Sequence, residues 1–107
     1  MVVGSGIMSA LGLRQSHDVD LIVSSEVFEK LKADGWQTGH IVDRPVIYKD
    51  NFDVGMYWAG QQLDYWLPKA TWIGGVPYLP IEDVLEWKQQ VGREKDAADI
   101  ALIKSYL

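Results

Sequence analysis

Two aspartates placed two residues apart are the strongest candidates in this chain for a catalytic or metal-binding role. Asp18 and Asp20 lie in a run, residues 18–23, whose other members are apolar and which predicts a buried strand. Side chains at i and i+2 of a strand point to the same face, so the two carboxylates should project together. Neighbouring carboxylates repel each other and resist burial. A divalent cation relieves both problems, and Mg²⁺ is typically held by one or two carboxylates together with substrate phosphates.

A glycine-serine turn upstream of the aspartates predicts a phosphate-binding element. Gly4, Ser5 and Gly6 follow a very short apolar strand, and the apolar spacing of residues 7–11 predicts a short helix directly after them. Free backbone N–H groups at such a turn can hold a phosphate. Together, the turn and the aspartates indicate a metal-dependent enzyme that acts on a nucleotide.

The elements that must position these residues are mixed strands and helices. Turn signals at Asp43-Arg44-Pro45 and Asp50-Asn51 divide a strand-rich middle. Strands are expected at residues 1–3, 18–23, 36–42, 46–49, 52–58 and 76–79. Helices are expected at residues 7–11, 26–33, 61–67, from 82 to an interruption at Gly92, and 93–106. This order favours an α/β or α+β fold, with one mixed sheet and helices packed on it, in a single domain over residues 1–107.

Composition limits the classes of function. The chain has 107 residues, 48% of them hydrophobic, a formal net charge of -5 and no cysteine. Disulfides and thiolate metal sites are therefore excluded, and a reducing cytoplasm is the expected location. The acidic balance argues against broad nucleic-acid binding, which needs many phosphate-neutralising cations. No apolar run approaches membrane-spanning length, so no membrane contact is expected.

The glycine-serine turn and the aspartate pair together resemble the signature of the nucleotidyltransferase superfamily, which has the DNA polymerase β-like fold. Residues 12–20, which include Arg14, are similar to the version found in small bacterial nucleotidyltransferases. Residues 88–100 are similar to the closing helices of the minimal bacterial group. Enzymes of this family transfer a nucleoside monophosphate from an NTP to an acceptor and release pyrophosphate.

The resemblance implies a catalytic site in which three acids hold two Mg²⁺ ions. By motif position, Asp18 and Asp20 are the metal-binding pair. Asp53 is the expected third acid, because alternation along its predicted strand sets it opposite the apolar face. Asp64 is the weaker candidate, since it lies in a segment that predicts helix. The metals would neutralise phosphate charge and align the acceptor hydroxyl, and the glycine-serine turn would bind the leaving phosphates.

Two basic residues have more than one expected role. Arg14 could contact the triphosphate through its planar fork, or pair with one of the two motif aspartates. Lys88 could bind a nucleotide phosphate, or form a salt bridge with Asp96 or Asp99 on the next helix. Both residues are therefore candidates for nucleotide binding with a structural alternative.

Other polar and aromatic residues are expected to be mainly structural. His17 and His40 are assigned to the framework, and the charged cluster at residues 93–96 to a solvated face. The five tryptophans are expected in the core and at interfaces rather than as a base-stacking platform. Tyr57 shares the predicted face of Asp53 and could line an acceptor pocket.

The leading hypothesis is a minimal nucleotidyltransferase that modifies a hydroxyl on a small molecule or a protein. The resemblance also suggests a toxin-antitoxin role, with a homodimer or a helical partner protein. Many relatives carry a helix before the Gly-Ser strand, which here begins almost at the first residue. That difference fits a minimal member, a recorded start that is late, or a face covered by another subunit. The alternative function is a non-catalytic nucleotide- or partner-binding module that retains the fold, such as an antitoxin-like member of a two-protein system.

Overall fold

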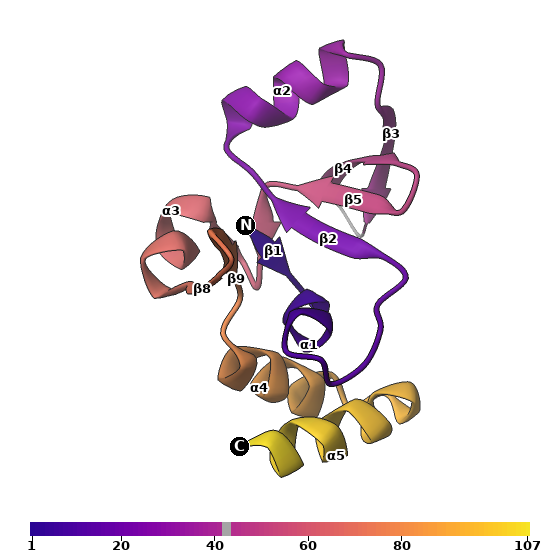
Figure 1. Cartoon of the computed structure of the whole chain (residues 1–107). Coiled ribbons are helices and arrows are strands. Elements are labelled where there is room, and N and C mark those ends of the chain that lie inside the picture. Colours follow the sequence, from indigo (N-terminus) through magenta and orange to yellow (C-terminus); the bar gives the residue numbers. More distant parts are fainter. Residues whose placement is uncertain (42–43) are drawn as a thin grey trace.

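The computed structural model describes residues 1–41 and 44–107 and has a mixed sheet at its centre. Within these residues, seven strands form the sheet in the order β3-β4-β5-β2-β1-β9-β8 (Figure 1). Their bounds are β1 (Val2–Val3), β2 (Val19–Ile22), β3 (Gln37–Ile41), β4 (Arg44–Lys49), β5 (Phe52–Gly55), β8 (Thr71–Ile73) and β9 (Val76–Tyr78). The expected α+β class with one mixed sheet is confirmed, and a two-stranded ribbon of β6 (Tyr57–Trp58) and β7 (Gln61–Gln62) adds to it.

Helices cover both faces of the sheet. They are α1 (Gly6–Ala10), α2 (Ser25–Ala33), α3 (Leu63–Trp66), α4 (Ile81–Val91) and α5 (Ala97–Tyr106). Figure 1 shows α2 above the strands and α1, α4 and α5 below them. Phe28 of α2 is buried with Ile47 and Val54 on the first face. A larger core on the other face includes Met8 and Ile103, so the sheet separates two apolar layers.

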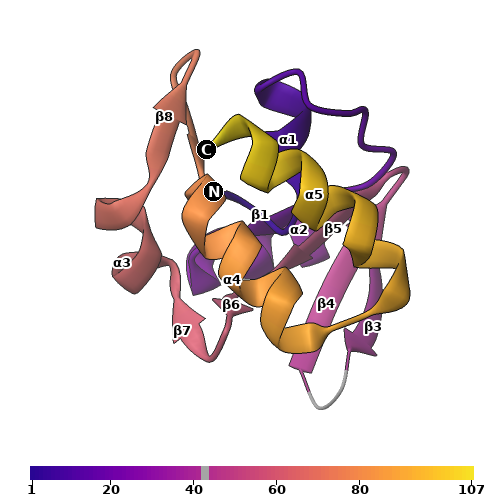
Figure 2. The same cartoon turned by 90° about the horizontal axis from the view of Figure 1, so that it is seen from below.

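The C-terminal helices leave part of their face of the sheet open. Figure 2 looks onto α4 and α5 and shows the hairpin of β3 and β4 extending past them. The larger core is built against β1, β2 and β9, whereas β4 contributes its buried residue to the cluster under α2. A sheet face that is covered at one end and open at the other provides the floor of a cleft.

A parallel pair of strands lies in the middle of the sheet. β2 and β5 run parallel, and their register places Asp20 opposite Asp53 and Ile22 opposite Gly55. β1 lies antiparallel on the other side of β2, and β4 lies antiparallel on the other side of β5. The acids therefore occupy the two central strands, where their neighbours on both sides fix their positions.

The strand predicted for residues 52–58 is divided, which corrects that expectation. β5 ends at Gly55, and Tyr57–Trp58 leaves the main sheet to pair with Gln61–Gln62. Met56 packs against the cluster under α2, whereas Trp58 packs against the larger core. The alternate residues of 52–58 therefore do not all lie on one face of the sheet. The helix predicted over residues 61–67 is present only from Leu63, and the strand at Thr71–Ile73 was not predicted.

The turn predicted at Asp43-Arg44-Pro45 is wrong for its last two residues, which begin β4. The ladder between β4 and β5 starts at Ile47, so Pro45 lies where β4 pairs with β3 alone. A strand position that lacks a second neighbour tolerates proline on its open side, because no partner strand there needs the missing N–H. Val42 and Asp43, which belong to the predicted strand and turn, lie outside the described residues.

Most helix boundaries follow the expected signals. Ser24 caps α2 by accepting a hydrogen bond from the N–H of Val27 at 3.3 Å, and Gly92 ends α4 with a φ of 64°. The helix predicted over residues 93–106 starts at Ala97, after a 3₁₀ turn (Glu94–Asp96). The turn at Asp50-Asn51 is also present, with Asp50 at a φ of 55°.

Candidate functional site

The site is built on Asp20 and Asp53, which lie directly opposite each other on β2 and β5. Residues paired in register on adjacent strands point to the same face, so the two carboxylates project side by side. Both side chains line one cavity. Asp64, the competing candidate for the third acid, lies on α3 and lines a separate, smaller hollow of about 330 Å³.

The electrostatics of this pair oppose ionisation. Burial raises the pKa of the Asp20 carboxyl, and the negative charges of Asp53 and Asp18 raise it further. A carboxylate that is both desolvated and surrounded by like charge is stabilised by a proton or by a bound cation. The pair is therefore a place where positive charge is favoured.

Asp18 is placed differently from the sequence expectation. It immediately precedes β2, is exposed, and is not among the residues that line the cavity. Its charge nevertheless acts on Asp20. In the described part of the chain, no group of three or more His, Cys, Asp or Glu side chains could hold a metal. The two carboxylates that do meet suit Mg²⁺, which is commonly held by one or two carboxylates plus water and substrate phosphate.

The glycine-serine turn contacts Asp20 closely. Gly4 has a φ of +63°, and a Cβ atom at this position would lie 2.8 Å from Oδ2 of Asp20. Glycine is therefore required at position 4 for two reasons, because the backbone is left-handed and because the Asp20 carboxylate leaves no room for a Cβ atom. At Gly6 a Cβ atom would collide with Val2, and the Ser5 side chain makes no capping hydrogen bond to α1. The predicted phosphate-binding residues thus lie beside the acid pair, with α1 only five residues long.

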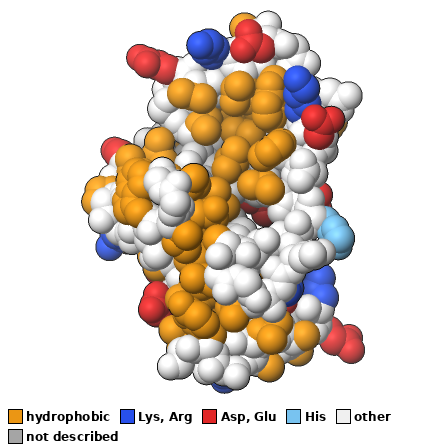
Figure 3. Space-filling view, in the orientation of Figure 1, with side chains coloured by type: hydrophobic (Ala, Val, Ile, Leu, Met, Phe, Trp, Pro, Cys, Tyr) orange, Lys and Arg blue, Asp and Glu red, His pale blue; other side chains and the backbone are white. Residues whose placement is uncertain are grey.

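The cavity in front of the acids measures about 530 Å³, which is within the range of small-molecule sites. Its walls are largely apolar and include Tyr57, Trp58 and Trp87. The rings of Trp58 and Trp87 meet edge to face with their centroids 4.8 Å apart. Figure 3 shows acidic atoms recessed below the surface beside a band of apolar side chains. Sequence reasoning assigned the tryptophans to core and interfaces, and it did not predict that two of them border a cavity.

Two arginines that sequence reasoning did not select also line the cavity. The guanidinium carbon of Arg44 lies 5.2 Å from the ring centre of Tyr57, and that of Arg93 lies 5.2 Å from the ring centre of Trp87. Stacking holds an arginine fork in place while its N–H groups stay available to an anion. The sequence carries no signal for Arg44. Arg93 could have been noticed because it directly follows the glycine that ends the helix of Trp87.

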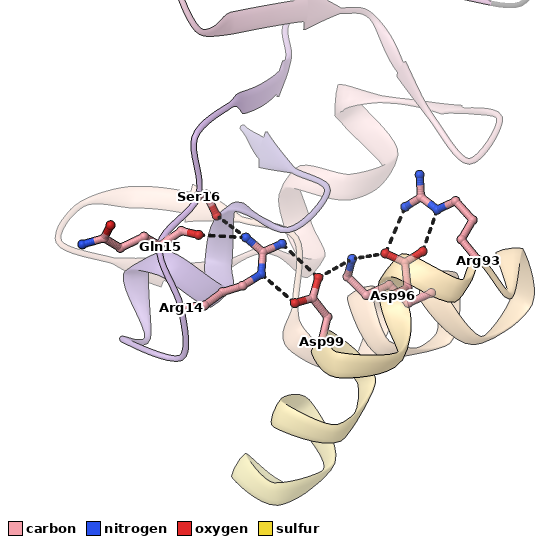
Figure 4. Close-up of polar contacts among 7 residues, drawn as sticks. Arg14, Gln15, Ser16, Arg93, Asp96 and Asp99 are labelled. Atoms are coloured by element: carbon pink, nitrogen blue, oxygen red, sulfur yellow. Dashed lines mark hydrogen bonds and ion pairs between the residues drawn. The ribbon is translucent and has the colours of Figure 1, made fainter.

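Arg14 and Lys88, the two basic candidates, belong to a separate ion network (Figure 4). Arg14 donates from Nε and Nη2 to the two carboxylate oxygens of Asp99, at 2.6 and 2.9 Å. Lys88 Nζ lies 2.9 Å from Asp96 and 3.1 Å from Asp99. The salt-bridge alternative for Lys88 is confirmed. Arg14 contacts neither motif aspartate, and its partner lies instead on α5.

The network continues to Arg93, which donates to Asp96 at 2.6 and 3.2 Å. The expectation of a solvated face at residues 93–96 is wrong for Asp96, whose residue is only 2% exposed. Burial alone would raise the pKa of Asp96 and of Asp99. Hydrogen bonds and charges from Arg93 and Lys88 at Asp96, and from Arg14 and Lys88 at Asp99, outweigh burial and lower both pKa values. This arrangement sets three cations against two carboxylates and places Arg93 at the cavity.

Comparison with protein family models, curated proteins and solved structures found no match for this chain. None of the helices in the described residues is long and apolar enough to span a bilayer. The functional argument therefore depends on the geometry of the acid pair and its cavity.

Proposed function

We propose that this protein is a Mg²⁺-dependent nucleotidyltransferase that moves an NMP group from an NTP to a hydroxyl acceptor. The observation that carries the proposal is the register of β2 and β5, which sets Asp20 beside Asp53 at a cavity with arginine and aromatic walls. The resemblance of the glycine-serine turn and the aspartate motif to the superfamily signature supports the same conclusion. Gly4 supports it too, because its contact with Asp20 joins the two parts of that signature.

Each residue has a defined part in this function. Asp20 and Asp53 would hold Mg²⁺, which when bound neutralises phosphate charge and orients the reacting groups. Arg93 would donate to a phosphate oxygen from the N–H groups that its pairing with Asp96 leaves free. Asp53 would accept the proton of the acceptor hydroxyl, whose oxygen forms the new bond to the α-phosphorus as the bond to pyrophosphate breaks. Asp18 would contribute negative charge from outside the cavity.

The location and partners follow from the same proposal. We place the protein in the cytoplasm, where NTP is plentiful and a chain without cysteine needs no oxidising compartment. The acceptor would be a small molecule or a protein side chain, and a second copy or a helical partner protein could complete the site.

A non-catalytic nucleotide-binding module is the second candidate. It is favoured by the position of Asp18, which leaves two rather than three acids at the cavity. Such a module would bind NTP at the same carboxylates without transferring the nucleotide.

Thermal unfolding with Mg²⁺ and each of the four NTPs tests the shared nucleotide site. A ligand at about 100 times its dissociation constant adds roughly 2.7 kcal/mol of stability. We expect that gain in the native chain and its loss in Asp20→Asn and in Asp53→Asn. Asp64→Asn is the matched control, because Asp64 lines the other hollow and should leave the gain intact. An unchanged gain in Asp20→Asn would contradict a site on the acid pair.

Pyrophosphate release separates the enzyme from the binding module. The native chain is incubated with the bound NTP and a panel of hydroxyl-bearing small molecules and proteins. Release that requires both an acceptor and Asp53 supports the transferase. Nucleotide binding without release from any acceptor on the panel favours the module.

A further inference from the structure

Gly55 occupies an unusual position for a glycine. It follows Asp53 by two residues on β5, shares its face and lines the cavity. Its backbone is not left-handed, so no turn requires glycine there. A Cβ atom at Gly55 would have one neighbour within 4 Å, Cγ1 of Val46 at an ordinary contact distance of 3.9 Å. Neither backbone strain nor crowding explains the missing side chain.

Glycine inside a strand has a cost, because it weakens the strand and packs nothing. Such a glycine often marks a place where another group approaches the backbone closely. Here Ile22 lies opposite on β2 and Val46 lies beside Gly55 on the side of β4. The result is a strip of bare backbone between two apolar side chains, which is a flat surface.

The direction of the cavity indicates what lies on this surface. On the β1 side of the acids, the cavity reaches Val3, which is only 2% exposed, and Gly4 is buried against Asp20. On the β4 side, the cavity continues past Gly55 to Val46 and Arg44. A nucleotide with its phosphates at Asp20 and Asp53 therefore has room for its base in this second direction.

The walls along this direction suit a planar ring. Tyr57 carries the Arg44 guanidinium on its face, and Trp58 and Trp87 also line the cavity. Bases stack on aromatic and guanidinium planes without the need for specific hydrogen bonds. We propose that Gly55 is the floor of the nucleobase slot, and that its missing side chain is what admits the base. This inference rests on the proposed nucleotide site and adds the position and determinant of base binding.

The test compares two probes, ATP and inorganic triphosphate, by equilibrium titration in Mg²⁺ with the native chain and Gly55→Val. The triphosphate lacks the base, so its affinity should be equal in both proteins. ATP should bind the native chain more tightly than triphosphate. In Gly55→Val it should bind roughly 10- to 100-fold more weakly than in the native chain, the scale of one lost base stack. Tryptophan fluorescence gives a second readout, because Trp58 and Trp87 border the slot.

Controls separate blockage from misfolding. Valine favours strands and the position has space, so thermal stability should be retained or raised. Gly55→Ala adds a single carbon and should cause a smaller loss of ATP affinity. Thr38→Ala changes an exposed side chain of β3, outside the cavity, and should leave ATP affinity unchanged.

The contrary outcomes are distinct. Equal affinity of ATP and triphosphate in the native chain would overturn the base slot while leaving the proposed function in place. Full ATP affinity in Gly55→Val would also overturn it, because the added side chain would then not occupy the space of the base. Absence of binding by either probe would contradict the proposed function itself, and the base slot with it.

Discussion

Two pairs of aspartates in this protein have opposite electrostatic surroundings. Asp96 and Asp99 are surrounded by Arg93, Lys88 and Arg14, and the pKa of each carboxyl is lowered. Asp20 has Asp53 and Asp18 as its charged neighbours, and its pKa is raised. The first pair is neutralised by cations of the chain, whereas the charged neighbours of Asp20 are acids, so a bound cation would stabilise its carboxylate. Burial of a charge is therefore a poor guide to function until its partners are known.

The two acid pairs also differ in their basic neighbours, which explains why two predicted phosphate-binding residues lie elsewhere. Arg14 and Lys88 were candidates for phosphate binding, and both neutralise acids of the C-terminal segment. Arg93 belongs to both regions, since it pairs with Asp96 and reaches the cavity. The ion network of the C-terminal helices therefore holds Arg93 at the cavity of Asp20 and Asp53.

Breaking the network at its centre should have the largest effect. Lys88→Met leaves Asp96 and Asp99 without their shared cation, in a place where the lysine side chain is only 2% exposed. Removing one partner from a buried ion pair costs about 3–5 kcal/mol. Urea denaturation should show this as a large fall in the midpoint. Lys30→Met, an exposed change on α2, should alter the free energy of unfolding by less than about 0.5 kcal/mol.

Removing one acid should have a smaller effect than removing the shared cation. Asp99→Asn deprives Arg14 of its bidentate partner and Lys88 of one contact, while Asp96 still neutralises Lys88. Hydrogen bonds to charged groups contribute about 1.5–3 kcal/mol, and a loss of stability in that range is expected. Asp34→Asn at the exposed end of α2 is the control. A loss as small as the control's would show that Asp99 does not stabilise the fold.

Changing the shape of the Arg14 side chain without changing its charge should lower the free energy of unfolding by still less. Arg14→Lys keeps the cation but removes the planar fork that meets both oxygens of Asp99. Because the arginine side chain is 33% exposed, solvent screening reduces the expected loss to about 1 kcal/mol. Calorimetry should show a fall in Tm of roughly 4–8 °C for a domain of this size. A fall as large as that of Lys88→Met would contradict the ranking of the two contacts.

The smallest effect should appear in the pH dependence of stability. The pKa of folded Asp20 is raised, so its carboxylate disfavours folding at neutral pH, and the cost disappears as pH falls through that raised pKa. Between the raised value and the ordinary value of 3.8, stability should therefore increase as pH falls. Asp83, also raised by burial and by Glu86 and Glu82, adds to this trend.

Asp96 and Asp99 have the opposite effect on the pH dependence of stability, at pH values below 3.8. Their folded pKa values are lowered, so their contribution is present above 3.8 and is lost as pH falls through the lowered values. Urea titrations from pH 7 to pH 2 should show a rise followed by a fall. Asp20→Asn should reduce the rise and leave the fall unchanged. A variant profile parallel to the native one over the whole range would contradict the role given to Asp20.

The sequence predicted those parts of the fold that depend on local signals. Ser24 and Gly92 bound helices as expected, and the mixed sheet was anticipated from alternating elements. The break after Gly55 was missed, because residues 52–58 alternate in sequence while their chain changes partners in space. Asp53 could be chosen from alternation, but its place opposite Asp20 depends on register, which no local signal encodes.

The site residues that escaped sequence reasoning share one cause. Arg44 lies on β4, whereas Trp87 and Arg93 lie on and just after α4, and only the folded chain brings these two regions to one cavity. Arg14 and Asp99 likewise meet across most of the chain, so their pairing was invisible to local spacing. Residue type suggested the chemistry, and tertiary packing decided which residues of that type take part.

The parallel pairing of β2 with β5 has a consequence for the order of folding. The β3–β4 and β8–β9 hairpins close over short stretches of chain, whereas β2 reaches β5 only after α2 and the β3–β4 hairpin have been traversed. Contacts distant in sequence form more slowly, because the entropy of closing the loop is lost before they can contribute. We expect the local hairpins to form first and the central pair late. A nucleotide present during refolding would then bind only after the rate-limiting step, and would slow unfolding without accelerating folding.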